Sequence, residues 1–253
     1  MDVTFLTALL LFAGGFMSGV VNAVAGGGTF ITFGALTLVG VPPISANATS
    51  AIAQFPGYVT SALAYRKDIA RIWRKAISYA LLSGAGALAG ALLLLSFDNV
   101  AFKAIVPWLL IAATILFAAG PRLMPKRRTQ DEAAPTGRAL SGKLVQFMTS
   151  IYGGFFGAGM GIMMLATLGL TERGDYHHLN ALKNLLSIVI AAVAIAVFVS
   201  GGVVAWREVA AIVPGVAAGG YSGVWAAKRL PLALTRFFVV AFGLFLACYY
   251  FYV

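Results

Sequence analysis

This chain has few charged side chains, and that scarcity is its first informative property. Charged residues make up 10% of its 253 residues, whereas hydrophobic residues make up 60% and the mean hydropathy is +0.91. Soluble domains carry about 25% charged residues, so a water-soluble protein with an ordinary surface is excluded. The composition favours an all-α polytopic membrane protein, because lipid cannot satisfy the backbone groups of open, irregular structure.

Signatures of catalysis and of metal binding are also scarce. The single cysteine, Cys248, permits no disulfide within the chain and is interpreted as a packing residue. No nucleophile-elbow, zinc-peptidase or phosphate-loop motif is apparent, so we expect no enzyme activity, no cofactor and no transport driven directly by ATP. The adjacent His177 and His178 lack a third ligand at a fixed spacing, and no metal site is predicted.

What the chain does have is a series of long apolar segments. A membrane-spanning helix needs about 20 apolar residues. Six stretches meet that length: 45–64, 77–96, 100–119, 180–199, 208–227 and 233–252. Two further apolar regions, 3–40 and 144–170, are interrupted by glycines. Region 144–170 is predicted to be a re-entrant hairpin, whereas 3–40 either crosses fully or forms a similar hairpin.

The chain also repeats itself at an offset of 133 residues. Ala25-Gly26-x-Gly28 returns as Ala158-Gly159-x-Gly161, Asn47-Ala48 as Asn180-Ala181, and Trp73-Arg74 as Trp206-Arg207. Two repeats, each with a glycine-broken segment, are typical of secondary transporters whose site lies between the halves. The sequence therefore predicts a first transmembrane repeat at 1–119, a basic cytoplasmic linker at 120–143 and a second repeat at 144–253.

The basic residues indicate that the two repeats are inverted. Basic loops face the cytoplasm, and the first repeat has such a loop after 45–64: Arg66, Lys67, Arg71, Arg74 and Lys75. The corresponding loop of the second repeat, around Trp206, has one cation and one acid, and its basic loop comes later, at 228–236. This alternation leaves Lys103 and Arg207 outside and predicts that both termini are periplasmic. We therefore interpret the net charge of +10 as basic residues that set the membrane topology and contact lipid headgroups, and we expect no nucleic-acid partner.

The repeated glycine turns are the candidate substrate site. A turn that opens a helix leaves backbone N–H groups unpaired at the positive end of the helix dipole, and such groups bind anions. The alternative is that these glycines serve close helix packing, which is the interpretation we prefer for Gly86 and Gly90 and for their repeats Gly219 and Gly223. The candidate substrate-binding residues are Asn22, Gly26, Gly27, Gly28, Thr29, Asn47, Ser50, Gln54, Gly159, Gly161, Asn180, Lys183 and Asn184.

Two kinds of candidate residue have an alternative role. Lys183 occupies the position equivalent to Ser50 and lies a few residues inside an apolar span, so it either binds substrate or extends its ammonium group to the membrane interface. Asn22, Asn47 and Asn180 are either ligands or helix caps.

The chain resembles the TauE/SafE sulfite-exporter-like transporter family (TSUP). The first motif comprises Gly15-Phe-Met-Ser-Gly19, Ala25 to Gly28, Gly40-Val-Pro-Pro43 and Ala46 to Ser50. The second comprises Gly153 to Gly161, with Met160 in place of a frequent glycine, followed by Asn180-Ala-Leu-Lys183. The resemblance implies two repeated halves that move a small anion, often a sulfur oxyanion or organosulfonate such as sulfite or sulfoacetate, across the bacterial inner membrane.

From the resemblance and the repeats we expect alternating access, driven by protons or the membrane potential. Membrane lipids are expected partners, and a homo-oligomer remains open. A polytopic membrane enzyme and a membrane scaffold or sensor subunit are the alternatives. A polar break in each half disfavours the scaffold, and the lack of a nucleophile–base pair at membrane depth disfavours the enzyme.

Overall fold

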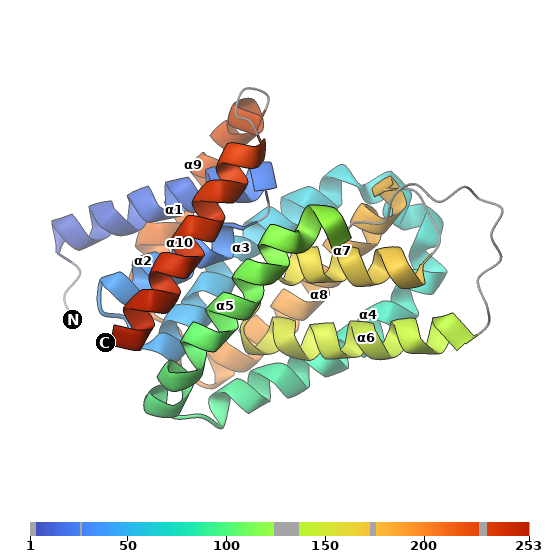
Figure 1. Cartoon of the computed structure of the whole chain (residues 1–253), viewed down its shortest axis with the longest axis horizontal. Coiled ribbons are helices and arrows are strands. Elements are labelled where there is room, and N and C mark those ends of the chain that lie inside the picture. Colours follow the sequence, from blue (N-terminus) through green and yellow to red (C-terminus); the bar gives the residue numbers. More distant parts are fainter. Residues whose placement is uncertain (1–3, 26, 124–136, 173–175, 228–231, 253) are drawn as a thin grey trace.

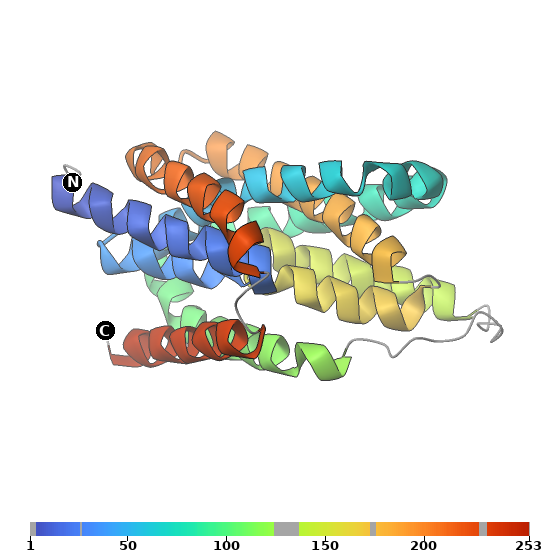
Figure 2. The same cartoon turned by 90° about the horizontal axis from the view of Figure 1, so that it is seen from above.

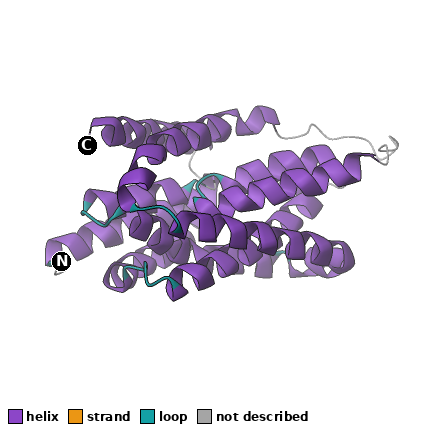
Figure 3. Ribbon diagram, turned by 90° about the horizontal axis from the view of Figure 1, so that it is seen from below, coloured by secondary structure: helices purple, strands orange, loops and turns teal. Residues whose placement is uncertain are grey.

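All described residues belong to helices or to the turns between them. The structure is a computed structural model that describes residues 4–25, 27–123, 137–172, 176–227 and 232–252, and these form ten helices and no strand (Figure 3). The first five helices are α1 (Phe5–Ala25), α2 (Gly28–Leu38), α3 (Pro43–Ala64), α4 (Arg66–Leu95) and α5 (Asn99–Leu123). The second five are α6 (Gly137–Phe155), α7 (Met160–Thr171), α8 (Tyr176–Ser200), α9 (Trp206–Ala227) and α10 (Leu232–Tyr252). The all-helical fold class is confirmed for this part of the chain.

The helix boundaries follow the sequence repeat. The helix α3 begins at Pro43 and α8 begins 133 residues later, at Tyr176. The same offset separates the start of α5 at Asn99 from the start of α10 at Leu232. The helix α9 departs from this pattern, since it has 22 residues where α4 has 30. The cause is the turn after α8, where Gly202 adopts a φ of 66°, a conformation that glycine accepts without steric cost.

The prediction of a basic loop after 45–64 is wrong. Arg66 and Lys67 open α4, with Tyr65 alone between that helix and α3. Lysine and arginine are good helix formers, and Asp68 places a negative charge in the first turn, where the helix dipole favours it. The predicted linker 120–143 is shortened in the same way, since α5 continues to Leu123 and α6 begins at Gly137. Its middle, 124–136, lies outside the described residues.

Within the described residues, four helical stretches are long and apolar enough to cross a membrane. They are Phe5–Asn22, Ala76–Leu95, Asn99–Leu116 and His178–Ser200. Three coincide with predicted spans, and the first shows that region 3–40 begins with a helix long enough to cross. The predicted spans 45–64, 208–227 and 233–252 form the helices α3, α9 and α10, of 22, 22 and 21 residues, and α10 contains the apolar stretch Phe237–Tyr252. The helix α3 is long enough to cross but less apolar than these four stretches, because its polar residues include Asn47 and Gln54.

The two glycine-broken segments form hairpins that point in opposite directions. The α1–α2 pair occupies the half of the molecule that holds the N-terminus, and the α6–α7 pair occupies the other half (Figures 1 and 2). Both helix breaks therefore lie near the middle of the long axis. We call the end of α1 at Ala25 together with Gly27, which precedes α2, the first break, and residues 156–159 the second break. These breaks occur where the sequence predicts them.

Each hairpin packs against a long helix of the other half. The helix α1 lies along α9, and α6 lies along α4, while α3 contacts α8 and α5 contacts α10. Glycines permit these close contacts: a Cβ atom on Gly90 would overlap the Ile151 carbonyl oxygen, and one on Gly219 would overlap that of Phe16. A Cβ atom on Gly86 would lie 2.8 Å from the Phe147 carbonyl oxygen. The predicted packing role is confirmed at these three glycines.

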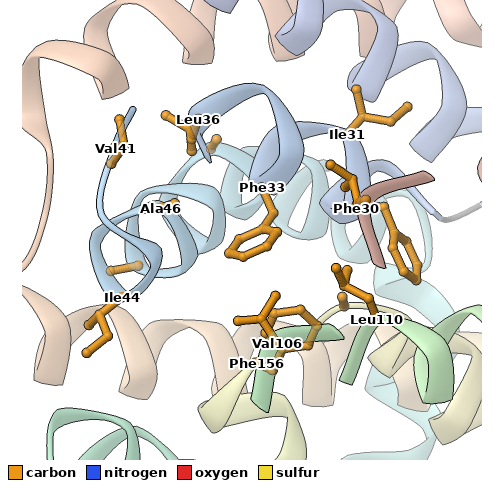
Figure 4. Close-up of a cluster of buried hydrophobic side chains, with 14 of the residues drawn as sticks. Phe30, Ile31, Phe33, Leu36, Val41, Ile44, Ala46, Val106, Leu110 and Phe156 are labelled. Carbon is orange, nitrogen blue, oxygen red and sulfur yellow. The ribbon is translucent and has the colours of Figure 1, made fainter. Parts of the chain in front are cut away.

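An aromatic and aliphatic core holds the first hairpin against the second break. Phe33 of α2 meets Phe156 edge to face, with ring centroids 5.4 Å apart, and Val106 and Leu110 of α5 complete this wall (Figure 4). Such aromatic pairs stabilise packing beyond their buried area. The core thus fixes the position of one break relative to the hairpin of the other half.

Candidate functional site

The first break is closed by side chains that bind backbone. The Ser18 hydroxyl of α1 donates a hydrogen bond to the carbonyl oxygen of Gly28 at 2.8 Å, and Gln54 Nε2 of α3 donates to Ser18 Oγ at 2.6 Å. A Cβ atom on Gly28 would lie 2.5 Å from the Ser18 carbonyl oxygen and 2.8 Å from Asn22 Cβ. Glycine is therefore required at position 28 for close approach of α1 and α2.

Buried hydroxyl groups extend this network along α2. Thr32 Oγ1 and Ser50 Oγ are 2.5 Å apart, and Thr32 also donates to the Thr29 carbonyl oxygen at 3.1 Å. Ser50 lies 3.5 Å from that same oxygen. We call Ser18, Thr29, Thr32, Ser50 and Gln54 the first-break cluster. All five are buried, with at most 9% of their surface exposed.

The second break is built differently. Gly157 and Gly159 both have a φ of +74°, which allows the chain to reverse between α6 and α7. The Tyr152 hydroxyl stabilises the turn by donating to the Ala158 carbonyl oxygen at 2.6 Å, and the Met160 N–H donates to the Gly157 carbonyl oxygen at 3.2 Å. No described backbone acceptor pairs with the Gly161 N–H.

Lys183 lies beside the start of α7. A Cβ atom on Gly161 would have one neighbour within 4 Å, the Lys183 Cδ atom at 3.8 Å. The lysine stem therefore passes the first turn of α7, where the free N–H groups carry partial positive charge. Among the described residues, no charged or hydrogen-bonding side chain pairs with the Lys183 ammonium group. A cation beside the positive end of a helix is stable when an anion lies between them.

The predicted asparagines have different partners in the two halves. Asn47 Nδ2 donates to the carbonyl oxygen of Phe155, the last residue of α6, at 2.9 Å. Asn180 Nδ2, at the equivalent position, donates to the Tyr65 hydroxyl at 3.0 Å, and its Oδ1 atom is buried without a partner. Neither residue caps its own helix, because each lies inside it. Asn47 instead ties α3 of the first half to the second break.

The structure divides the predicted site residues into two groups. Asn22, Gly28, Thr29, Ser50 and Gln54 gather at the first break, and a Cβ atom on Gly57 would lie 3.5 Å from Asn22 Nδ2. Gly159, Gly161 and Lys183 gather at the second break. Asn184, buried on α8, lies next to Lys183 in sequence, and Gly27 precedes α2. Gly26 lies outside the described residues.

The sequence reasoning missed Ser18, Thr32 and Tyr152. Each is a polar side chain within an apolar helix, which is the one signal that could have pointed to it. Their partners are backbone carbonyls at the two breaks, so their role appears only when the helices are placed together.

Comparison with known proteins gives one consistent result. The family described as Sulfite exporter TauE/SafE matches residues 11–250. A protein of Haemophilus influenzae, described as a probable membrane transporter protein, is 31% identical over 82% of this chain and 80% of its own length. Similar proteins from a Sinorhizobium species and from Escherichia coli K12 are 29% and 25% identical, over 71% and 78% of this chain and 67% and 72% of theirs, and both carry the same description. With its family match over nearly the whole length and its apolar helices, this multi-pass membrane protein belongs to the sulfite exporter TauE/SafE family of membrane transporters.

Proposed function

We propose that this protein is a secondary transporter that moves a small anion, a sulfur oxyanion or organosulfonate of the sulfite and sulfoacetate type, across the bacterial inner membrane. The observation that carries the proposal is the position of Lys183 beside the first turn of α7. The family to which the chain belongs, described as Sulfite exporter TauE/SafE, supports the substrate class. In this proposal no covalent bond of the anion is made or broken, so the protein acts as a transporter and not as an enzyme.

The physical argument rests on charge. An ammonium group and the start of α7 both present positive potential, and the described residues supply no acid to balance them. The ammonium group and the start of α7 both favour a bound anion, since lysine side chains and helix starts each stabilise negative charge. An anion that entered this region without them would be left unpaired in a low-dielectric interior, at a cost of several kcal/mol. We therefore place the bound anion between Lys183 and the Gly161 N–H.

Alternating access between two inverted halves is part of the same proposal. It is supported by the charge pattern of the sequence and by the opposite directions of the α1–α2 and α6–α7 hairpins (Figure 2). Transporters of this kind bind substrate where two inverted repeats meet, at broken helices near the membrane midplane. The two breaks lie together in the middle of the molecule, so motion of one hairpin against the other would open the site to each side in turn. Periplasmic termini belong to this arrangement.

Transport in proteoliposomes tests the proposal. Purified protein would be reconstituted and offered labelled sulfite, sulfoacetate, thiosulfate, sulfate and short carboxylates, with protein-free liposomes as the control. We expect at least one sulfur-containing anion to accumulate and to be competed by its unlabelled form. Lys143→Gln, which removes an exposed lysine of α6, is the matched control for charge and should transport normally. Absence of transport for the whole panel, with correctly folded protein, would rule out the proposed substrate class.

A further inference from the structure

One hydrogen-bond acceptor of the first-break cluster is left without a donor. The hydroxyl proton of Ser18 is used on the Gly28 carbonyl oxygen, and that of Thr32 is directed to Thr29 or to Ser50. Gln54 Nε2 donates to Ser18 Oγ. The other amide atom of this side chain, Gln54 Oε1, is buried and has no donor. Because Gln54 is only 1% exposed, bulk water does not supply that donor.

The orientation of the Gln54 amide follows from its neighbours. A serine hydroxyl has one proton, and Ser18 gives that proton to Gly28. Ser18 Oγ can therefore only accept from Gln54, which requires the amide nitrogen to face it. Reversing the amide would leave two acceptors face to face. The unpaired oxygen of Gln54 is thus a consequence of the whole network.

The second half has a fixed cation where the first half has oxygen atoms. Lys183 occupies the position that Ser50 occupies in the first repeat. None of the five cluster residues carries charge. The cluster therefore cannot hold a transported proton, because a proton needs a group that titrates in the working pH range.

We propose that the first-break cluster binds a monovalent alkali cation, with Na⁺ as the ion to test, and that this ion drives the anion movement proposed above. Neutral oxygen atoms without a carboxylate suit a singly charged ion, whereas Mg²⁺ and Ca²⁺ are held by carboxylates. The cluster borders the last turns of α1, and helix C-terminal ends and unwound carbonyls are the groups with which broken helices bind Na⁺. The coupling role rests on the proposed function, but the binding itself does not.

Binding can be measured without any transported substrate. The unfolding temperature of the detergent-purified protein would be recorded against NaCl, with choline chloride holding ionic strength and chloride constant. We expect Na⁺ to raise the Tm saturably, by about 2–4 °C at saturation, because a ligand that binds only the folded state stabilises it. Gln54→Met should abolish this shift. An equal Tm at all Na⁺ concentrations in the wild-type protein would overturn the proposal.

Gln146 provides a matched control variant. It is a buried glutamine of α6 whose Nε2 also donates to serine hydroxyls, Ser83 at 3.1 Å and Ser150 at 3.2 Å, and whose Oε1 also lacks a partner. Gln54 also lies within a helix, but Gln146 bonds to Ser83 of α4 and Ser150 of α6 and to no residue of the first-break cluster. Gln146→Met should therefore keep the Na⁺ shift. Equal loss of the shift in both variants would overturn the assignment to the first break. Thr32→Val, which keeps the side-chain shape, replaces Gln54→Met if that variant does not fold, and should also lose the shift.

Transport separates this inference from the proposed function. Anion uptake would be measured with an inward Na⁺ gradient, with a K⁺ gradient and with a proton gradient at equal membrane potential. The proposal predicts that uptake depends at least tenfold on Na⁺. Uptake that follows the proton gradient or the potential alone would overturn the coupling role and leave the transport function intact. A saturable Na⁺ shift without transport of any offered anion would support the cation site while refuting the proposed function.

Discussion

The two helix breaks share one repeated sequence motif, but different interactions stabilise them. At the first break Gly28 is crowded by α1, and buried hydroxyl and amide groups surround it. At the second break Gly161 is open on the side that faces Lys183, and the turn depends on two glycines with positive φ. The comparison teaches that a repeated glycine motif does not imply a repeated role.

The same difference separates the charge of the two breaks. Repeat-equivalent positions carry a hydroxyl at Ser50 and an ammonium group at Lys183. Among the described residues, the fixed positive charge therefore lies at the second break, which is why we propose that the anion binds there. If both halves contributed equally, substitutions at equivalent positions would have equal effects, and the alanine substitutions at Gly28 and Gly161 test that alternative.

Labelling from one side of the membrane should give the largest contrast. In a Cys248→Ala background, Lys103→Cys and Arg207→Cys should react with a membrane-impermeant thiol reagent added outside, while Arg128→Cys should react only after the membrane is opened. The reason is the inverted charge bias, together with the fact that α5 and α9 both begin toward the end of the molecule that holds the termini (Figure 1). Reaction of positions 103 and 128 from the same side would contradict inversion of the halves.

Alanine at the two equivalent glycines should affect folding unequally. Gly28→Ala places a methyl group 2.5 Å from the Ser18 carbonyl oxygen, so we expect a loss of about 1–3 kcal/mol of stability through overpacking. Gly161→Ala places its methyl group 3.8 Å from Lys183 Cδ, an ordinary contact, and should change stability by less than about 0.5 kcal/mol. Reversible unfolding in mixed detergent micelles measures both. Equal losses would mean that the breaks are alike.

Much of this fold could be predicted from the sequence, because its signals are local. Apolar length and the offset between Asn47 and Asn180 predicted the helices and their repetition, and glycines predicted both breaks. The start of α4 at Arg66 was missed because a cluster of cations resembles a loop in composition, although each residue favours a helix.

The site was less predictable, because its hydrogen bonds join segments far apart in the chain. Ser18 meets Gln54 only after α1 and α3 are packed, and Asn47 meets Phe155 across 108 residues. No pattern within a single helix encodes such pairs. The crowding of Gly28 and the openness of Gly161 were likewise invisible, since their motifs read the same.

Removal of the fixed charge should weaken anion binding. Lys183→Gln is expected to lower anion affinity about tenfold or more, equivalent to about 1.4 kcal/mol, because only the partial charges at the start of α7 remain. Lys183→Arg should retain part of the affinity, since it keeps the charge but changes the shape. Binding would be measured by calorimetry with the anion that proves to be transported, and Lys143→Gln is the control. Unchanged affinity in Lys183→Gln would mean that the lysine only anchors α8 at the membrane interface.

The smallest expected effect distinguishes the cost of a left-handed backbone from the cost of a steric clash within the second break. At Gly159 the nearest atom to a new Cβ would be 3.6 Å away, so Gly159→Ala meets no steric obstacle from its neighbours. Its φ of +74° nevertheless belongs to the left-handed region, where a side chain costs about 1 kcal/mol. Gly161→Ala, two residues later and within α7, carries no such cost and is the control. We expect Gly159→Ala to lower the unfolding free energy by about 1 kcal/mol. We also expect it to weaken anion binding, because a change in the turn would move the start of α7 away from Lys183. If Gly159→Ala proves as stable as Gly161→Ala, the turn is not held in its left-handed form, and the helix start that faces Lys183 is less preorganised than its geometry implies.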